Sequence, residues 1–260
     1  MKITVLGCGS STGVPHPTLG WGTCIASNLK NRRTRSSVLI EAKDISILID
    51  TSPDLRQQLL NLGYIPQIDA VFYTHVHYDH TAGIGELRPM FYKKNTLTPV
   101  YGTQDVIDYI HQIGSFMFEN TTDQYIYHPV LSSKIIDGDF ILTSKNKNIL
   151  NIRTFQMQHG VLMCTGYRIN NFAYATDVKT FPDGELDKLH GLDVLIIDCL
   201  THARNSIAHA NLTQVLEWVE KVHPKMTYLT HMDLSMDYDT LIKELPDYIK
   251  PAYDGLVIEV

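Results

Sequence analysis

Four side chains that commonly bind metals lie within six positions of this sequence. The segment reads His75-Val-His77-Tyr-Asp79-His80 and follows an apolar run at positions 70–73. That run is typical of a buried β-strand, so the histidines stand where the strand ends and the chain turns. Side chains two positions apart on an extended segment share a face, so His75 and His77 can hold one cation. Asp79 and His80, further round the turn, then point toward a second cation beside it.

Imidazole and carboxylate ligands in this combination favour Zn²⁺, Mn²⁺ or Fe. We therefore expect two divalent metal ions as cofactors, zinc or manganese first and iron as a further candidate. A hydrolytic reaction is the chemistry that such a pair supports. The alternative is a polar loop whose histidines are ordinary surface groups. Four potential ligands in six positions favour the metal site over that loop.

The run supplies only about half of two coordination shells, so further ligands must come from later in the chain. Three residues stand where a stretch of β-type sequence ends, namely His159, Asp177 and His231. Each of them alone is weak evidence. Their shared position strengthens them, because open sheets place ligand groups at the ends of strands.

This ordered set of seven residues resembles the metallo-β-lactamase superfamily, and the resemblance covers nearly the whole chain. It implies an α/β fold, an αββα sandwich of two mixed sheets face to face with helices outside. It also implies how the ligands divide. One metal would take His75, His77 and His159, the other would take Asp79, His80 and His231, and Asp177 would bridge them.

Departures from the family pattern narrow the choice of activity. True β-lactamases of this fold usually carry a cysteine where Asp177 stands, which argues against antibiotic hydrolysis. The 29 residues that follow His231 leave no room for the helical substrate domain that glyoxalase II enzymes append. Asp177 follows His159 by only 18 positions, too few for the RNA-binding arm of the bacterial tRNA 3′-processing endonuclease.

What remains resembles the ribosyl cyclic phosphate phosphodiesterase branch. Four segments carry this likeness, at positions 6–15, 31–37, 209–212 and 253–255. One departure concerns a cysteine-rich cluster of that branch, because the matching stretch here retains only Cys24, and we therefore predict no structural zinc. The implied activity is hydrolysis of a small cyclic or nucleotide-like phosphodiester. A thioester or lactone hydrolase, an RNA-processing endonuclease that lacks the arm, and a non-catalytic nucleotide-binding module stay open.

Catalysis of phosphodiester cleavage requires a proton for the leaving alkoxide. Two adjacent cations lower the pKa of a water between them and neutralise the phosphoryl oxygens, but they do not protonate the leaving group. We assign this proton to His209, just before a predicted helix, because an imidazole pKa of about 6.5 suits general acid catalysis. His209 and Asp79 are thus the catalytic residues. The alternatives are an exposed helix-entry histidine at this position and His202 as the donor.

Two segments are candidates for substrate binding. The glycine-rich stretch 7–13 follows the first predicted strand, so its backbone N–H groups could bind a phosphate oxygen. It lacks the Lys-Ser/Thr ending of a P-loop, and a plain tight turn is the alternative. The basic loop 30–35 is either a local cationic patch or a solvated turn, and Arg35, nearest the next strand, is expected to turn inward. The residues assigned to the substrate are Ser10, Ser11, Thr12 and Arg35.

Other elements are expected to support this site. Asp50 ends a predicted strand at 46–49 and is assigned to hydrogen-bond a metal-ligating imidazole, because the second N–H of such a ring usually binds a carboxylate or carbonyl. A cap for the following helix is the alternative. That helix is predicted between Ser52 and Gly63, and another begins after Asn211, which forms a loose capping box with Gln214.

Composition indicates an ordinary globular enzyme. The 260 residues are 44% hydrophobic and contain no linker or low-complexity stretch, so one α/β domain over residues 1–260 is expected. No signal peptide or membrane-length apolar run is evident, and four cysteines without paired spacing fit reduced thiols, so we expect a cytoplasmic protein without membrane contact. The net charge of −6 argues against long nucleic acid. A small phosphodiester or nucleotide is the expected partner, and a homodimer is left open.

Overall fold

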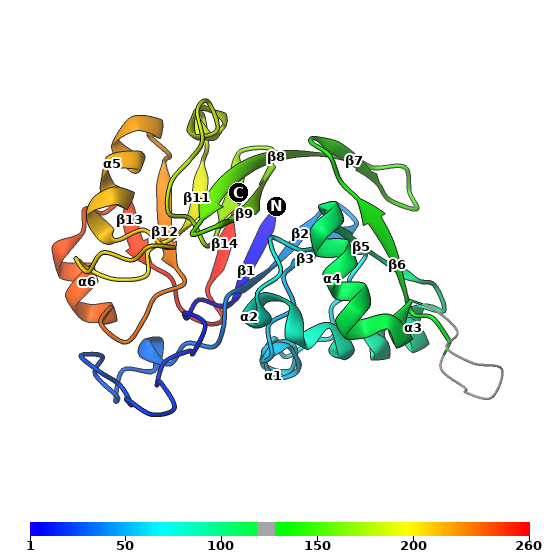
Figure 1. The fold of residues 1–260 in the computed structure, drawn as a ribbon, viewed down its shortest axis with the longest axis horizontal. Helices are drawn as coiled ribbons and strands as arrows, with labels where there is room; N and C mark the ends of the chain where they lie inside the picture. Colours follow the sequence, from blue (N-terminus) through cyan, green and yellow to red (C-terminus); the bar gives the residue numbers. More distant parts are fainter. Residues whose placement is uncertain (119–127) are drawn as a thin grey trace.

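Two seven-stranded β-sheets pack face to face in the computed structural model, which describes residues 1–118 and 128–260 (Figure 1). Helices cover the outer face of each sheet. This arrangement confirms the predicted αββα sandwich, and both sheets are mixed, as expected. The chain builds the first sheet mainly from its first half and the second sheet from its second half.

The first sheet has the order β14-β1-β2-β3-β4-β5-β6. Its pairs from β14 to β3 are antiparallel, and its pairs from β3 to β6 are parallel. The last strand of the chain therefore lies beside the first strand, at one edge. The strands are β1 (Lys2–Gly7), β2 (Ser37–Ala42), β3 (Ile45–Ile49), β4 (Ala70–Phe72), β5 (Thr98–Gly102), β6 (Leu131–Ile135) and β14 (Val257–Glu259).

The second sheet has the order β13-β12-β11-β10-β9-β8-β7. It too divides into an antiparallel part, from β7 to β10, and a parallel part, from β10 to β13. The strands are β7 (Phe140–Thr143), β8 (Ile149–His159), β9 (Leu162–Ile169), β10 (Phe172–Ala175), β11 (Val194–Asp198), β12 (Met226–Thr230) and β13 (Ile249–Pro251).

Most helices lie on the outside of the sandwich. The α-helices are α1 (Leu55–Asn61), α2 (Tyr78–Thr81), α3 (Arg88–Lys94), α4 (Gln104–Gly114), α5 (Leu212–Val222) and α6 (Tyr238–Glu244). The short 3₁₀ helices are η1 (Leu29–Asn31), η2 (Ala82–Leu87), η3 (Ser115–Met117) and η4 (Leu186–Leu189). In Figure 1, α1 to α4 lie on one side of the sheets, and α5 and α6 lie on the other.

Of the two predicted helices, one begins where the sequence predicted and the other begins later. Asn211 and Gln214 form the expected capping box at the start of α5, with the Asn211 side chain accepting from the Gln214 backbone N–H at 3.1 Å. The helix predicted from Ser52 begins later, at Leu55. The Ser52 hydroxyl instead donates to Gln58 and accepts from the Asp54 N–H, which makes a turn before the helix.

Hydrophobic side chains fill both faces of the central strands. In β2, Val38 and Ile40 belong to the cluster between the sheets, whereas Leu39 belongs to the cluster beneath the helices. Side chains alternate between the two faces of a strand, so a continuous apolar run buries both faces. The core therefore leaves polar side chains to the ends of the strands, and that is where the candidate ligands stand.

One edge of the sandwich collects the ends of several strands. Parallel strands end on the same side of a sheet, so the segments that follow β3, β4, β10, β11 and β12 meet there. The antiparallel strand β8 reaches the same edge with its final residue, His159. Among the described residues, no helix is long and apolar enough to cross a bilayer.

Strands β8 and β9 depend on close contact between Gly166 and Phe155, which are paired across the two strands. A Cβ atom at position 166 would lie 2.1 Å from the Phe155 ring, which is buried. Gly166→Ala should therefore lower the free energy of unfolding by about 1–3 kcal/mol, the usual cost of overpacking a core. Urea denaturation measures this change. Gly85→Ala is the matched control, since its new Cβ meets no atom within 4 Å, and equal stability of the two variants would contradict the expectation.

Candidate metal centre

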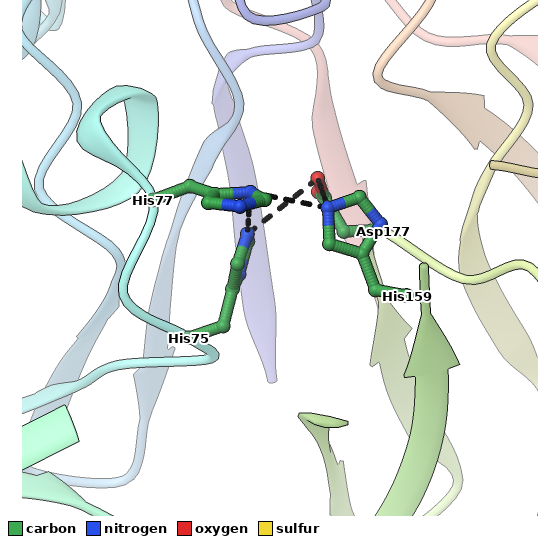
Figure 2. A group of neighbouring side chains, drawn as sticks. All are labelled: His75, His77, His159 and Asp177. Atoms are coloured by element: carbon green, nitrogen blue, oxygen red, sulfur yellow. Dashed lines mark hydrogen bonds and ion pairs between the residues drawn. The ribbon is translucent and has the colours of Figure 1, made fainter. Parts of the chain in front are cut away.

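The first ligand group comes from both sheets (Figure 2). It consists of His75 and His77 from the loop after β4, His159 at the end of β8, and Asp177 after β10. The His77 Nδ1 atom lies 3.0 Å from His75 Nε2 and 3.1 Å from His159 Nε2. Ligand atoms held at about 2.1 Å from one tetrahedral metal are roughly 3.4 Å apart. The three nitrogens thus converge at close to the spacing that a shared cation requires.

The second group lies beside the first and shares Asp177 with it. Its members are Asp79, His80, Asp177 and His231. The Asp79 Oδ2 atom lies 3.2 Å from His80 Nε2 and 3.3 Å from His231 Nε2. Asp177 turns Oδ1 toward His80, at 3.2 Å, and Oδ2 toward His231, at 3.4 Å. The same Oδ2 lies 3.7 Å from His75 Nε2, so one carboxylate faces both groups.

Unusual backbone conformations place three of the side chains at this edge. Asp50, Asp177 and His231 have φ angles of 63°, 58° and 55°, in the left-handed region that favours glycine. Each residue stands directly after a strand or within two residues of its end. Such conformations cost of order 1–3 kcal/mol and persist where surrounding contacts fix them, frequently at functional sites.

Asp50 supports the second group through hydrogen bonds. Its Oδ2 lies 2.7 Å from His80 Nδ1 and accepts the Thr74 hydroxyl, while its Oδ1 accepts the Thr74 backbone N–H. This contact binds the second nitrogen of His80 and orients Nε2 toward Asp79 and Asp177. The Asp50 side chain therefore lies against an imidazole of the site, as predicted, and its contacts with Thr74 and His80 do not cap α1.

The electrostatics of the pocket fit a divalent cation. Burial lowers the pKa of His75, which keeps the imidazole neutral, as a ligand must be. Burial opposes charge on Asp79 and Asp177 as well, yet the neighbouring histidines hold the pKa of each carboxyl well below its usual value. His80 Nε2 is buried and lies 3.2 Å from a carboxylate oxygen of Asp79 and of Asp177, without a well-aligned hydrogen bond to either. Burial disfavours charge on His80, but the neighbouring carboxylates raise its pKa well above the usual value. Two ionised carboxylates that converge with ring nitrogens in a buried site are the pattern expected around a metal position.

His209 lies beside both groups and pairs with a carboxylate. Its Nδ1 atom lies 2.9 Å from Asp198 Oδ2 and 4.0 Å from Asp177 Oδ2. Its ring stacks on that of His231, with centroids 4.7 Å apart. Burial disfavours the charged form, but the Asp198 carboxylate outweighs it and raises the pKa of His209 to about 9. With Nδ1 held by Asp198, Nε2 is the atom able to donate a proton.

His202, the alternative proton donor in the same loop, lies away from the candidate metal centre. Its Nε2 atom is 2.8 Å from Glu244 on α6, and its side chain is half exposed. It belongs to none of the metal-binding groups found among residues 1–118 and 128–260. The structure therefore brings His209, and not His202, to the candidate centre.

The glycine-rich loop approaches the centre from the first sheet. The Ser10 backbone N–H donates to the Met232 carbonyl at 3.1 Å, and Met232 follows the ligand His231. Ser10 is buried, whereas Ser11 and Thr12 are exposed. Ser11 and Thr12 follow Ser10 directly in the chain, and their contact with a substrate stays a prediction.

The expectation that Arg35 is the inward residue of the basic loop is wrong. Arg33 is the buried residue, with a side chain that donates to the Met236 carbonyl at 2.6 Å and contacts Cys24 Sγ. Arg35 is partly exposed, and its Nε lies 3.0 Å from Asp54. Arg33 pairs with Val14 in a short antiparallel bridge, whereas Arg35 pairs with Gly9 and contacts Asp54, just before α1.

Asp198 and Asp254 are two contributors that sequence reasoning missed. Asp198 ends the apolar strand β11, so the rule that identified Asp177 and His231 would also have identified Asp198. Asp254 accepts the backbone N–H groups of Cys8 and Thr34, which ties the glycine-rich loop to the basic loop. Burial raises the pKa of Asp254 to about 6.

Comparisons with known proteins agree with this geometry. Residues 46–232 match the model of the beta-lactamase superfamily domain. The crystal structure of a diphosphatase from the PhnP family superposes with a TM-score of 0.88 at 30% identity, covering 100% of this chain and 97% of that one. The probable metallo-hydrolase YhfI of Bacillus subtilis is 26% identical, over 99% of this chain and 96% of its own.

A further relative is longer than this chain. The octanoyltransferase of Porphyromonas gingivalis is 30% identical over 258 residues, which is 98% of this chain but 51% of the relative. This chain therefore spans about half the length of that protein. The match runs along nearly all of the present sequence, so it spans the positions of the two ligand groups described above.

Removal of the shared carboxylate should disrupt both ligand groups. Asp177→Ala is expected to lose most of the bound metal, because Asp177 is the one residue that belongs to both. Elemental analysis of protein purified and dialysed in parallel measures this loss. Asp187→Ala, at a carboxylate that is 79% exposed, is the matched control and should keep full metal content. Two tightly bound ions in the Asp177 variant would contradict the shared role.

The Asp50 carboxylate should act on metal affinity through His80. Asp50→Asn keeps the size of the side chain but removes the charge that faces His80 Nδ1. We expect metal binding to weaken by about 10- to 100-fold, the usual effect of removing a partner behind a ligand. Competition with a chelator measures the affinity, and circular dichroism checks that the fold is retained. Unchanged affinity in a folded variant would assign Asp50 a purely structural role.

Proposed function

This chain belongs to the beta-lactamase superfamily, and on that premise we propose that it hydrolyses small phosphodiesters, with His209 as the proton donor. The coarser statement, a hydrolase of the metallo-β-lactamase fold, follows from family membership and the paired ligand groups. The observation that carries the finer proposal is the pairing of His209 with Asp198, only 4.0 Å from Asp177. Alkoxide leaving groups need such a donor.

The ligand assignment in this proposal follows the two groups. His75, His77 and His159 would hold one metal, Asp79, His80 and His231 the other, and Asp177 would bridge them. When bound, two divalent ions such as Zn²⁺, Mn²⁺ or Fe lower the pKa of a water between them and offset the charge of the phosphoryl oxygens. Every remaining task falls to the side chains and backbone of this chain.

Those tasks can be assigned to residues already described. Asp50 keeps His80 in one ring orientation, and Asp198 does the same for His209. His209 Nε2 then donates its proton to the oxygen that leaves. The Ser10 N–H is used to anchor the glycine-rich loop to the Met232 carbonyl, so the Ser10 side chain and the N–H groups of Ser11 and Thr12 would contact a phosphoryl oxygen. Arg35, paired with Asp54, would contribute positive charge at longer range.

The similarity to a diphosphatase supports a phosphoryl substrate over an acyl one. That protein matches this chain over nearly its whole length at 30% identity. By its name it acts on a diphosphate, which is a phosphoric anhydride. A phosphodiester presents the same phosphoryl oxygens to the metals and differs in the group that leaves. Small phosphodiesters and nucleotides are therefore the substrates to test first.

An acyl thioester is the second candidate substrate. The observation in its favour is the similarity to the Porphyromonas gingivalis octanoyltransferase, of which this chain spans about half. A thiolate leaves without needing a proton, so an acyl thioester hydrolase would not depend on His209. Rates on a 2′,3′-cyclic nucleotide and on an octanoyl thioester, measured with the same metal-loaded protein, distinguish the two reactions.

Loss of the donor should slow phosphodiester hydrolysis and leave the metals in place. His209→Ala is expected to lower kcat on a 2′,3′-cyclic nucleotide by about 100-fold or more, within the range that general acids contribute. The loss should be smaller on bis(4-nitrophenyl) phosphate, because nitrophenolate leaves without a proton. Steady-state kinetics measure both rates, and elemental analysis confirms the metal content.

His202→Ala is the matched control for this experiment. It removes another histidine of the same loop, one that contacts Glu244 instead of the metal groups. Its kcat on both substrates should stay within about two-fold of the unmodified protein, as for a surface substitution. A His209→Ala protein with full activity on the cyclic nucleotide would remove His209 from the reaction.

A further inference from the structure

Two strongly exposed apolar side chains stand next to the candidate centre. Val161 is 96% exposed and Ile207 is 91% exposed, the highest values among large hydrophobic residues in the described ranges. Val161 follows the ligand His159 by two positions, and Ile207 precedes His209 by two. The most water-exposed apolar groups of the described chain therefore lie on the two segments that carry a proposed ligand and the proposed acid.

A contact from a histidine ring to a backbone carbonyl and a close approach of the chain hold these two segments together. The His159 Nδ1 atom lies 2.8 Å from the Ala208 carbonyl oxygen. A Cβ atom built on Gly160 would lie 3.6 Å from the Ala208 side chain, which is ordinary van der Waals contact. Val161 and Ile207 flank this contact, one on each segment. We call this pair of exposed apolar residues the Val161–Ile207 rim.

The fold itself does not require an apolar residue at either position. Gly160 and Val161 are the two residues of the turn between β8 and β9, where His159 pairs with Leu162. Gly160 has the positive φ of 58° that the turn needs, so the backbone at position 161 does not require a particular residue type. Polar residues are usual in such turns. A side chain that is almost fully exposed also adds nothing to the core. Both side chains are therefore free to contact a molecule outside the chain.

A second copy of the chain is a poor match for this rim. A stable protein contact buries roughly 800 Å² on each partner, far more than two aliphatic side chains present. The nearest strongly exposed charged group on the same loop, Arg204, is 71% exposed and paired with Asp233. A small organic group, covered by two side chains beside a polar centre, suits the size of the rim better.

We propose that the Val161–Ile207 rim binds the organic group of the leaving alcohol, an aromatic or aliphatic substituent of the phosphodiester. This inference rests on the proposed function, in which His209 protonates the leaving oxygen. An ester substituent begins at that oxygen, so it must extend past the residues that neighbour His209, and Ile207 is two positions away. The preferred substrates then carry an apolar or aromatic alcohol, such as a nucleoside or an aryl group, in place of a small polar one.

Binding of two simple phosphodiesters tests the rim. Titration calorimetry on the metal-loaded protein compares diphenyl phosphate with dimethyl phosphate, which share the charge and differ in apolar area. We expect diphenyl phosphate to bind at least about 10-fold more tightly, the effect of covering one to two aliphatic side chains. Val161→Ser and Ile207→Ser should each reduce that preference, and the double variant should abolish it. Binding of dimethyl phosphate should not change.

Ile141→Ser is the matched control. Ile141 is 62% exposed on β7 and pairs with Asn151, eight residues along β8 from His159 and thus about 26 Å away. It should leave both affinities unchanged. Equal binding of the two phosphodiesters, or a double variant that keeps the preference, overturns the rim assignment. So does a double variant whose only change is weaker self-association in sedimentation velocity, since the rim would then join two copies.

The outcome for the rim is separable from the outcome for the proposed function. Preferential binding of diphenyl phosphate that the double variant abolishes supports the rim, whether or not turnover occurs. Absence of hydrolysis of every phosphodiester in the same metal-loaded protein would overturn the proposed function alone. Hydrolysis of both phosphodiesters with equal affinity would overturn the rim alone.

Discussion

The buried carboxylate of Asp177 is the group around which the candidate centre is organised. Isolation of a charge from water is strongly unfavourable unless partners compensate it, and no lysine or arginine reaches this carboxylate among the described residues. Its compensation comes from imidazoles that both sheets supply. The rest of the site follows from this demand, because each imidazole must in turn be oriented by a partner, such as Asp50 behind His80.

The fold meets this demand through the arrangement of its strands. The parallel halves of the two sheets end at a common edge, so short loops suffice to bring together residues that are 152 positions apart, such as Asp79 and His231. A hydrophobic core on both faces of the strands fixes their ends in position. Precise placement of ligands thus depends on packing that lies well away from them.

Much of this organisation was visible in the sequence. The clustered histidines after β4 and the polar residues after β8, β10 and β12 indicated which side chains would meet, because strand ends in a sandwich share an edge. Asp198 followed the same rule and was overlooked, since one residue at one strand end carries little information. Arg33 could not be distinguished from Arg35, because the buried guanidinium of Arg33 is held by the Met236 carbonyl, which is 203 positions away. The contact of His209 with Asp198 likewise depends on the path of a loop.

The left-handed backbone at Asp50, Asp177 and His231 has a consequence for protein engineering. Transplanting the seven ligand side chains together with Asp50 onto the strand ends of a different sandwich would reproduce the amino acids and not the directions in which they point. A recipient scaffold must offer backbone that already tolerates positive φ at three separate junctions. Searches for hosts should therefore begin with loop torsions, and the choice of ligand residues should come second.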